Sequence, residues 1–561
     1  MKVGLIDDEI IVMEPGDRYK ALAQYMRWDK RTKSLRARAT LERLNGLAGI
    51  FTLFTLPRAL SALRERLQRK QAMIEKLRAD ENPRPLMDFP IKPGIKLFAH
   101  QIRAVNMCLT EFGQDEHKGF GLLFEMGLGK SLTAVTIMGC LHEMRRIKRV
   151  LVVAPTSVVA VWPKELHAFA SFPWRAKALV GDKKHRLEAL YELAEWQHSG
   201  IDVAVVNYET VHRDWMLDAL LEYNPDLIIA DESQRIKTNG AKQSKAMHKL
   251  GDRAKYKLIL SGTPVQNNAV DLYSQYRFLN SAVFGTNFYS FKNRYCIMGG
   301  FQRHQIVGYQ NEDELIKKVH SIALRVTKAE ALDLPPQTFE TRWVVFSPKE
   351  RKIYDQLRRD GIAELENAAA ITATTVLTKL LRLQQFTGGF LPDESGRAMP
   401  QNTAKLDALA DILEDYVVEV GRKLVIFARF TAEIEAIEAM LRKKKIAFGA
   451  IHGDIPIAER GDIVKDFQEN PDTLVFIAQL QCAGLGITLT AASMAVYYSL
   501  NFNYADYAQS LARIHRIGQK DNCHYINLVA ENSVDMRVME ALEAKGDIAK
   551  KLVDDWRKYF E

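Results

Sequence analysis

With 561 residues, the chain is too long for one hydrophobic core and predicts three or four domains. Its 47% hydrophobic and 26% charged residues are typical of a soluble globular protein, and no apolar stretch is long enough to span a bilayer. The net charge is +9, of which residues 1–90 carry +6 (18 Lys and Arg against 12 Asp and Glu); this suits a polyanionic partner, although a solvated basic face explains it equally well.

The N-terminal sequence and the cysteines predict a protein that is not exported. The N-terminus begins with a charged IDDE sequence instead of a basic and then apolar region, so no secretory signal is predicted. The five cysteines form no CxxC pair and no metal-ligand spacing. We therefore expect reduced thiols and a cytoplasmic protein without a membrane anchor.

Residues 1–90 differ in composition from the rest of the chain. Val3–Ile6 and Ile10–Met13 flank a charged turn and predict a β-hairpin. Leucine and isoleucine then recur at helical spacing between positions 60 and 77, which predicts a helix that packs on a neighbour. Four prolines and a glycine between positions 82 and 94 mark a boundary.

Residues 119–137 (GFGLLFEMGLGKSLTAVTI) have the pattern of a phosphate-binding loop. An apolar run is followed by a glycine turn, by Lys130 and Ser131, and then by a helix-forming segment. In such a loop, backbone N–H groups bind phosphate oxygens, the lysine reaches the β- and γ-phosphates, and the hydroxyl holds Mg²⁺. The strict pattern has glycine where this chain has Phe124, so on this stretch alone an ordinary turn between strand and helix is the alternative.

From about residue 95 the sequence alternates between apolar, β-branched runs and helical segments, which predicts a doubly wound parallel sheet. The predicted strands are Val150–Ala154, Val203–Asn207, Leu227–Ala230 and Lys257–Leu260. Pro155, Asp231 and Ser261 follow directly on three of these runs. They are therefore expected at the carboxyl ends of strands, where open α/β sheets bind ligands.

Residues 281–400 lose this alternation and become aromatic and then helical. A second α/β series begins near Thr403, and its predicted strands are Lys423–Ala428, Ala447–Ile451, Leu474–Ile477, Ala495–Tyr498 and His524–Leu528. Because one of the two halves carries a phosphate loop, we expect a nucleotide clamped between two lobes.

The pair Asp231–Glu232 ends an apolar run about a hundred residues after the loop. Mg²⁺ that bridges two phosphates requires a carboxylate ligand, and the attacking water requires a base, so Asp231 suits the first role and Glu232 the second. Alone, such a pair is common in any protein. The LSGTP sequence at Leu260–Pro264 ends the next predicted strand, and its hydroxyl groups are placed to hydrogen-bond the acidic pair.

Arg513 and Arg516, in the sequence QSLARIHRIGQ, lie three positions apart and share one face of a helix. A cation that reaches the nucleotide from the opposite lobe stabilises charge on the transferring phosphoryl group. The alternative for an isolated RxxR is a solvated basic helix face.

Taken together, EMGLGKS, VVAPTSVVAVW, VVNYETV, DESQRIK, LSGTPVQNN, LVIFARF, AGLGITLT and QSLARIHRIGQ resemble the ordered motif set of the Swi/Snf-type ATPases, a branch of helicase superfamily two. The resemblance runs from about Leu97 to Val538. It implies two tandem RecA-like lobes of α/β class, with ATP in the cleft between them and DNA across both. The expected domains are an N-terminal basic α+β accessory domain (1–92), the first lobe (93–280), helical protrusions and a linker (281–400), the second lobe (401–545) and a C-terminal brace or tail (546–561).

The resemblance also implies roles for residues that match family motifs. The expected phosphate-loop residues are Met126, Gly127, Leu128, Gly129, Lys130 and Ser131. The expected acidic box is Asp231 and Glu232, with Ser131 and Asp231 as Mg²⁺ ligands, and the arginine pair is Arg513 and Arg516. Gln101 matches the glutamine that recognises adenine, while Thr156, Tyr208 and Thr488 fall where the family lines its DNA track.

Some positions depart from the family pattern. The acidic box is DESQ where DEAH is usual, which leaves open how its third and fourth residues couple to the motor, and Thr488 stands where asparagine is common. LQQFTGGF at Leu383–Phe390 resembles the small bacterial and viral members and the annealing-helicase branch. The basic stretch Arg27–Arg43, which contains Trp28, resembles the HARP module of annealing helicases.

We therefore expect an ATP-dependent translocase on double-stranded DNA that uses ATP and Mg²⁺ and binds DNA with little sequence preference. The alternatives are a strand-separating DNA or RNA helicase and a nucleotide-gated binding module without turnover. The sequence does not specify the pathway, the preferred DNA structure, the protein partners or the oligomeric state.

Overall fold

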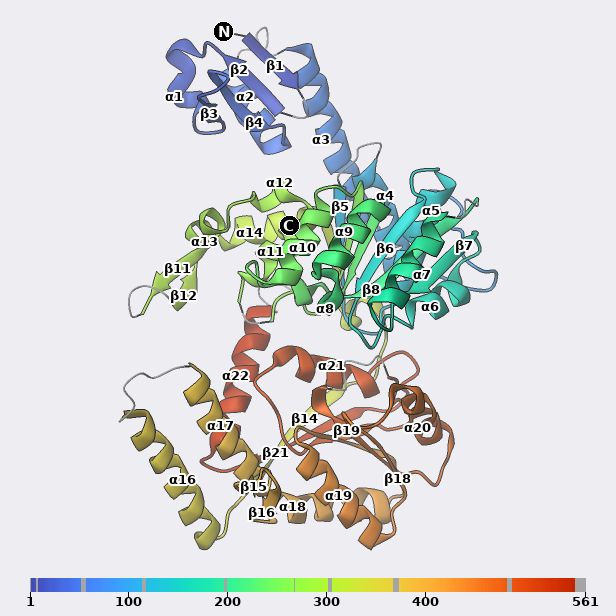
Figure 1. Ribbon diagram of the computed structural model, residues 1–561, viewed down its shortest axis with the longest axis vertical. Helices are drawn as coiled ribbons and strands as arrows, with labels where there is room; N and C mark the ends of the chain where they lie inside the picture. Colours follow the sequence, from blue (N-terminus) through green and yellow to red (C-terminus); the bar gives the residue numbers. More distant parts are fainter. Residues whose placement is uncertain are drawn as a thin grey trace.

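The computed structural model describes residues 2–6, 9–51, 57–113, 118–195, 199–266, 268–300, 305–366, 373–481 and 487–549. Three parts follow one another along the long axis of the molecule (Figure 1). A small N-terminal module (residues 2–51) stands above lobe 1 (residues 80–326), and lobe 2 (residues 337–549) lies below lobe 1. The interlobe strap (residues 327–336) joins the two lobes.

The N-terminal module is an antiparallel sheet with helices on one side. The sheet has the strand order β1-β2-β4-β3, and the paired strands β1 and β2 confirm the predicted hairpin. Its elements are β1 (Lys2–Ile6), β2 (Glu9–Met13), η1 (Gly16–Arg18), α1 (Tyr19–Leu22), β3 (Arg27–Asp29), β4 (Ser34–Arg38) and α2 (Leu41–Ile50). Ile10, Val12, Leu35, Leu44 and Leu47 form its core.

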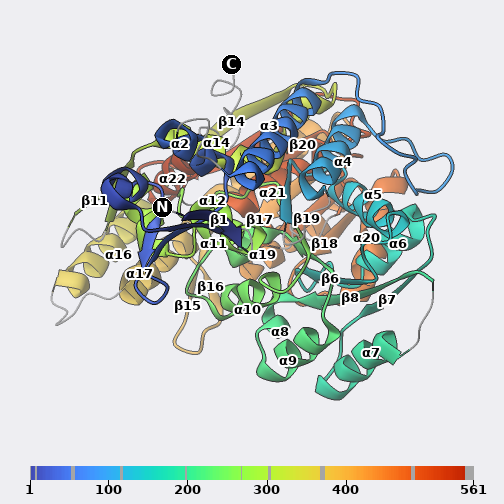
Figure 2. The same cartoon turned by 90° about the horizontal axis from the view of Figure 1, so that it is seen from above.

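Helix α3 (Arg58–Ala79) connects the module to lobe 1 and belongs to both. Leu60 near its start is buried in the core of the module, whereas Ile74 and Leu77 near its end are buried in the core of lobe 1. Arg78 is buried and donates to the backbone carbonyls of His320 and Ala323. The module lies above α12 and α14 and away from α6 and α7 (Figure 2).

Lobe 1 contains a seven-stranded parallel sheet with the order β13-β5-β10-β9-β6-β8-β7. The four strands predicted from apolar runs are β6, β8, β9 and β10, and all are buried. The strands are β5 (Lys118–Phe124), β6 (Arg149–Ala154), β7 (Trp174–Ala178), β8 (Ile201–Asn207), β9 (Leu227–Asp231), β10 (Tyr256–Leu260) and β13 (Ala323–Val326). Alternate residues of these strands belong to two separate cores, one on each face of the sheet.

Helices connect these strands. They are α4 (Ala99–Phe112), α5 (Lys130–Glu143), α6 (Trp162–Phe169), α7 (Lys183–Glu195), α8 (Tyr208–Val211), α9 (Asp214–Tyr223), η2 (Ser233–Ile236), α10 (Lys242–Gly251) and α11 (Asp271–Leu279). After them come α12 (Ser281–Phe284), α13 (Phe288–Tyr295), the antiparallel hairpin β11 (Cys296–Gly299) and β12 (Gln305–Tyr309), and α14 (Glu312–Ser321).

The segment 281–400, predicted as helical protrusions and a linker, contains helices and the interlobe strap. It also supplies one edge strand to each large sheet: β13 pairs with β5 in lobe 1, and β14 pairs with β21 in lobe 2. Four-residue β13 is too short for its pattern to be distinguished from a helix. Between the two strands, the interlobe strap contains α15 (Lys328–Ala331).

Lobe 2 contains a six-stranded parallel sheet with the order β14-β21-β20-β17-β19-β18. Its strands are β14 (Gln337–Val344), β17 (Leu424–Ala428), β18 (Phe448–Ile451), β19 (Val475–Gln479), β20 (Met494–Tyr497) and β21 (Cys523–Ala530). The other elements are α16 (Pro348–Glu366), α17 (Ala373–Thr387), β15 (Phe390–Pro392), β16 (Ala398–Pro400), α18 (Ala404–Ile412), η4 (Leu413–Val418), α19 (Thr431–Lys444), α20 (Ile457–Glu469), α21 (Tyr504–Ile514) and α22 (Val534–Ala549). Two parallel sheets flanked by helices confirm the predicted fold class.

Among the described helices, none is both long and apolar enough to cross a bilayer.

Candidate functional site

The phosphate loop connects buried strand β5 to helix α5. Gly127 and Gly129 have φ angles of 87° and 75°, a left-handed conformation that favours glycine. A Cβ at Gly129 would also clash with the side-chain amide of Gln101, and one at Gly127 would lie 3.4 Å from Cβ of Arg516. The loop therefore favours glycine at both positions. The glycine that the strict pattern has in place of Phe124 would lie inside strand β5, before the turn begins.

Lys130 and Ser131 occupy the first turn of α5, where backbone N–H groups of a helix N-terminus favour anions. Lys130 Nζ donates to the carbonyl of Phe124 at 3.1 Å, so the ammonium lies back over the loop. Burial lowers the pKa of Lys130, while the charges of Glu232 and Asp231 act in the opposite direction. In the folded protein, Lys130 therefore lies close enough to Asp231 and Glu232 for their charges to interact.

Asp231 is the last residue of β9 and is buried. Trp162 Nε1–H donates to its Oδ2 at 3.0 Å, and the Tyr208 hydroxyl donates to its backbone carbonyl at 2.8 Å. Burial and the charge of Glu232 raise the pKa of Asp231 to about 7, whereas Lys130 lowers it. A buried carboxylate at a strand end, with one donor fixed on the carboxylate and another on the backbone carbonyl of the same residue, is a rigid position for a cation ligand.

A chain of hydrogen bonds runs from Glu232 to the LSGTP segment. Gln234 Nε2 donates to Glu232 Oε2, and the Ser261 hydroxyl donates to Gln234 Oε1, both at 2.8 Å. The N–H of Thr263 then donates to Ser261 Oγ at 3.2 Å. In addition, the Ser233 hydroxyl donates to Gln275 Oε1 at 2.7 Å. The third and fourth residues of DESQ therefore both couple the acidic box to neighbouring segments.

Gln101 lies beside the phosphate loop, on α4. Its Oε1 accepts from the N–H of Phe98 at 2.8 Å, and its Nε2 donates to the carbonyls of Gly129 and Leu128 at 3.4 and 3.5 Å. His100, which the sequence analysis did not single out, contacts the same Leu128 carbonyl through Nε2 at 3.0 Å. This pair holds the loop from the α4 side.

Two other predicted loop residues differ in exposure. Leu128 is 1% exposed and packs in the core of lobe 1. Met126 borders a cavity of about 440 Å³ between the lobes. The side chain of Leu128 is therefore not available to a ligand.

The arginine pair reaches this site from lobe 2. Arg513 and Arg516 donate through Nη1 to the carbonyl of Ile487 at 3.4 and 3.3 Å. Burial and the charge of Arg516 lower the pKa of Arg513 to about 10, and Glu232 acts in the opposite direction. Since Arg516 also lies against Gly127, the structure brings the loop, the acidic pair and both arginines together across the two lobes.

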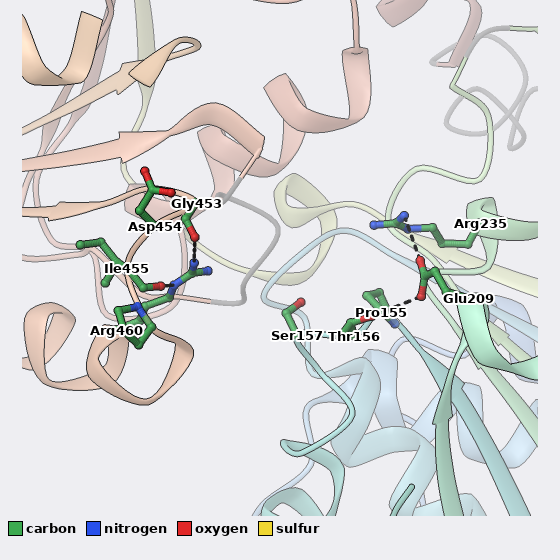
Figure 3. A pocket seen from close by; sticks show the side chains of 10 residues that line it. Pro155, Thr156, Ser157, Glu209, Arg235, Gly453, Asp454, Ile455 and Arg460 are labelled. Atoms are coloured by element: carbon green, nitrogen blue, oxygen red, sulfur yellow. Dashed lines mark hydrogen bonds and ion pairs between the residues drawn. The ribbon is translucent and has the colours of Figure 1, made fainter. Parts of the chain in front are cut away.

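A second cavity, of about 430 Å³, lies between the lobes at another place. Its lobe 1 residues are Pro155, Thr156, Ser157, Glu209 and Arg235, and its lobe 2 residues are Gly453, Asp454, Ile455, Pro456 and Arg460. The two sets face each other across the gap (Figure 3). Thr156 donates to Glu209 Oε2 at 3.2 Å and accepts from Asn207 Nδ2 at 2.9 Å.

The side chain of Tyr208, a residue predicted to line a DNA track, is buried in lobe 1. Tyr208 is 1% exposed, and its hydroxyl is used to hold the carbonyl of Asp231. The position after a strand was inferred correctly, but the side chain points into the core. Thr488 is half-buried and lies between Ile487, which both arginines contact, and Leu489, whose N–H donates to the carbonyl of Arg513 at 2.9 Å. The predicted glycine turn before Thr488 falls on residues 482–486, outside the described residues.

No described group of three His, Cys, Asp or Glu side chains could hold a metal ion by itself. The residues fit Mg²⁺ in another way, because this ion keeps several waters and takes one or two protein oxygens beside phosphate oxygens. The buried carboxylate of Asp231 supplies an oxygen of this kind. The Ser131 hydroxyl, in the first turn of α5, is a second candidate.

Two models of known protein families match the chain. The model of the SNF2-related domain matches residues 100–388, which is more than half of the 561-residue chain. The chain belongs to the SNF2-related family. In this SNF2-related chain, a second model, the helicase conserved C-terminal domain, matches residues 404–518. The first match contains the phosphate loop and the acidic pair, and the second contains Thr488 and both arginines.

Relatives of this SNF2-related chain include an uncharacterized ATP-dependent helicase of Mycoplasma genitalium, which is 27% identical over 79% of this chain and 41% of the relative. The DNA repair and recombination protein RAD54-like of Drosophila persimilis is 25% identical over 77% of this chain and 60% of the relative. The chain thus spans about two fifths to three fifths of the length of these relatives. The solved Sulfolobus solfataricus SWI2/SNF2 ATPase core in complex with dsDNA is 24% identical, covers 85% of this chain and 97% of the solved chain, and has a TM-score of 0.40.

Proposed function

We propose that this chain is a DNA-dependent ATPase that moves along double-stranded DNA. The observation that carries the proposal is the position of Arg516 of lobe 2, whose Cβ would lie 3.4 Å from a Cβ placed on Gly127 of the phosphate loop in lobe 1. Lobe 1 supplies Lys130 and the acidic pair for ATP hydrolysis, and lobe 2 supplies the two arginines. Hydrolysis therefore depends on how the lobes are arranged, and a cycle of closing and opening is available for movement.

Individual residues take distinct roles in this proposal. Lys130 binds the β- and γ-phosphates, and the backbone of Gly127–Gly129 cradles them. Asp231 and Ser131 would hold Mg²⁺, which supplies charge neutralisation between the phosphates when bound. Glu232 orients the attacking water and accepts its proton, and Arg513 and Arg516 stabilise charge on the transferring phosphoryl group.

DNA is proposed to lie across the cavity of about 430 Å³ that both lobes border. Arg235 and Arg460 are the cationic side chains that border it, and Thr156 and Ser157 add hydroxyl groups. Cations and hydroxyls of this kind contact phosphates and sugars, which gives an affinity that depends on salt more than on sequence. The DNA repair function in the name of the RAD54-like relative supports a DNA substrate.

ATPase activity measured against a panel of nucleic acids tests the proposal. We expect duplex or branched DNA to stimulate turnover more than single-stranded DNA or RNA. Lys130→Ala should abolish turnover on every substrate while the protein stays folded. Near-normal turnover in Lys130→Ala, or equal stimulation by RNA and duplex DNA, would contradict the proposal.

A strand-separating helicase is the second candidate, and one feature favours it. The hairpin β11–β12 projects from lobe 1 (Figure 1), and it exposes Ile297 and Val307 to 45% and 61%. A strand separator needs an apolar projection of this kind at the point where a duplex opens. The two candidates differ in whether a plain forked duplex is unwound.

A further inference from the structure

The interlobe strap is fastened to the phosphate loop in lobe 1. Arg325, just before the strap, donates through Nη1 to the carbonyls of Leu123 and Gly262, each at 3.0 Å. The backbone N–H of Lys328 donates to Oε2 of Glu125 at 2.8 Å. Glu125 is the first residue of the loop after β5. A displacement of the loop is therefore transmitted to Lys328 through this hydrogen bond.

The same lysine reaches lobe 2 with its side chain. Lys328 Nζ donates to the backbone carbonyl of His515, and Lys328 is 9% exposed. His515 Nε2 in turn contacts the carbonyl of Pro335 in the strap at 2.9 Å. His515 stands between Arg513 and Arg516, so the strap holds the backbone from which both arginines project.

A buried cation at this place is costly to the fold. Burial lowers the pKa of Lys328 to about 8, and the charges of Arg516, Arg513 and Lys130 act in the same direction, with Glu125 opposing them. Packing does not explain the residue either, because Lys328 and His515 both border the cavity of about 440 Å³. Residues that break a local rule without a packing reason are frequent at functional positions.

We propose that Lys328 is a positioning residue that aims Arg516 of the arginine pair at the phosphate loop. It links Glu125 of the loop to the carbonyl of His515, so the state of the loop sets the position of Arg516. The inference rests on the proposed function, because it names a further residue needed for hydrolysis in the same site. Lys328 acts through Arg516 and needs no contact with the nucleotide.

Lys328→Met, which keeps the length of the side chain and removes its donor, is the first test. With saturating duplex DNA, we expect kcat for ATP to fall by about 10²-fold, because a misplacement of about 1 Å has effects of this size. KM should change by less than about threefold, since the ATP contacts of lobe 1 stay intact. Lys328→Arg retains a donor and should recover part of the loss. The exposed Lys249→Met in α10 is the matched control, and its kcat should equal that of the unchanged protein.

Combining the change with Arg516→Ala separates positioning from general damage. If Lys328 acts through Arg516, Lys328→Met should reduce kcat by less than about threefold in the Arg516→Ala protein. A full loss of about 10²-fold in both backgrounds would overturn the inference, as would an unchanged kcat in Lys328→Met or a loss seen in KM alone. Failure of the proposed function itself is distinguishable, because Lys130→Ala would then keep its ATPase activity.

Thermal unfolding of each variant controls for folding. If Lys328→Met does not fold, Glu125→Gln tests the same link from the other side, because it weakens the acceptor for the Lys328 N–H and keeps the shape of the side chain. We expect Glu125→Gln to lower kcat more than KM and to show the same loss of effect in the Arg516→Ala background. Equal loss in both backgrounds would count against the inference here as well.

Discussion

Glu232 has a φ angle of 51°, which is uncommon for a residue with a side chain and stores strain at the end of β9. The Gln234 amide donates to the carboxylate of Glu232. This hydrogen bond and the backbone conformation together hold the carboxylate next to Asp231. We therefore expect Glu232→Gln to bind ATP and to lose its hydrolysis, by about 10²–10⁴-fold in kcat. Binding of a fluorescent ATP analogue and steady-state turnover check both parts. Loss of ATP binding would contradict the division of roles in the acidic pair.

The buried carboxyl group of Asp231 should make the stability of the protein depend on pH. Its pKa is raised to about 7 in the folded protein, above the value of about 3.9 in an unfolded chain. Its contribution to stability is therefore present at low pH and is lost as the pH rises through 7. In the nucleotide-free protein, Asp231→Asn should raise the free energy of unfolding at pH 8 by about 1–3 kcal/mol, and at pH 5 by much less.

Denaturant unfolding at the two pH values measures this difference, and the exposed Asp411→Asn is the control. A second readout is Mg²⁺-ATP binding by the unchanged protein, which should weaken as the pH falls below 7 because a proton then competes for the carboxylate. Equal effects of Asp231→Asn at both pH values would show that the ionisation of Asp231 does not change between pH 5 and pH 8.

Much of the site could be predicted from sequence because its residues are local in the chain. Gly127, Gly129, Lys130 and Ser131 form one turn, and Asp231 and Glu232 directly follow an apolar run. Lys328, Trp162 and His100 could not be assigned in this way, since their partners lie 28 to 187 positions away and are set by tertiary packing. The burial of Tyr208 could not be predicted for a related reason: a position after a strand does not specify where a side chain points.

Helix α3 is the element whose role depends most on the three-dimensional structure. Periodicity predicted the helix, but the proline-rich stretch that follows it suggested that residues 1–92 separate cleanly from lobe 1. Instead, its last turns carry Ile74, Leu77 and Arg78 into that lobe. The edge strand β14 was also not predicted, although Phe339 and Trp343 alternate with polar residues in the manner of an edge strand.

Two truncations test the shared helix. Removal of residues 1–57 should leave a folded ATPase, because α3 and its contacts with lobe 1 remain. Removal of residues 1–87 should destabilise lobe 1, because it uncovers the site of Ile74 and Leu77, each worth about 1.5–3 kcal/mol when buried. Thermal unfolding and ATPase activity on saturating duplex DNA distinguish the two proteins. Equal thermal stability would show that α3 is dispensable to lobe 1.

Arg78→Met examines the polar part of the same contact. The substitution leaves the carbonyls of His320 and Ala323 without their donor in a buried place. We expect a loss of about 2–4 kcal/mol in the free energy of unfolding, measured by denaturant titration. Arg66→Met, near the middle of α3 and exposed, provides the comparison within the same helix. A loss below about 0.5 kcal/mol for Arg78→Met would mean that water replaces the guanidinium.

At the scale of the whole molecule, the proposed movement along DNA has a measurable effect on strands bound to the duplex. A motor that follows intact duplex should displace a triplex-forming strand with ATP and should unwind a plain forked duplex poorly. Its DNA affinity should fall as salt rises, because phosphate contacts dominate the grip. Strand-displacement assays on both substrates, with Lys130→Ala as the inactive control, measure the difference. Efficient fork unwinding without triplex displacement would favour the helicase candidate and a role for the hairpin β11–β12.

The ten residues between β13 and β14 limit how far the lobes can separate. Ten extended residues span at most about 33–36 Å, and the helical turn of α15 shortens this reach. A tether of this length keeps Arg516 near the phosphate loop at an effective concentration in the range of about millimolar. In the proposed cycle, the return of Arg516 to the phosphate loop after each hydrolysis is therefore a first-order event within one chain. Turnover per molecule is expected to be unchanged when the protein is diluted at saturating DNA.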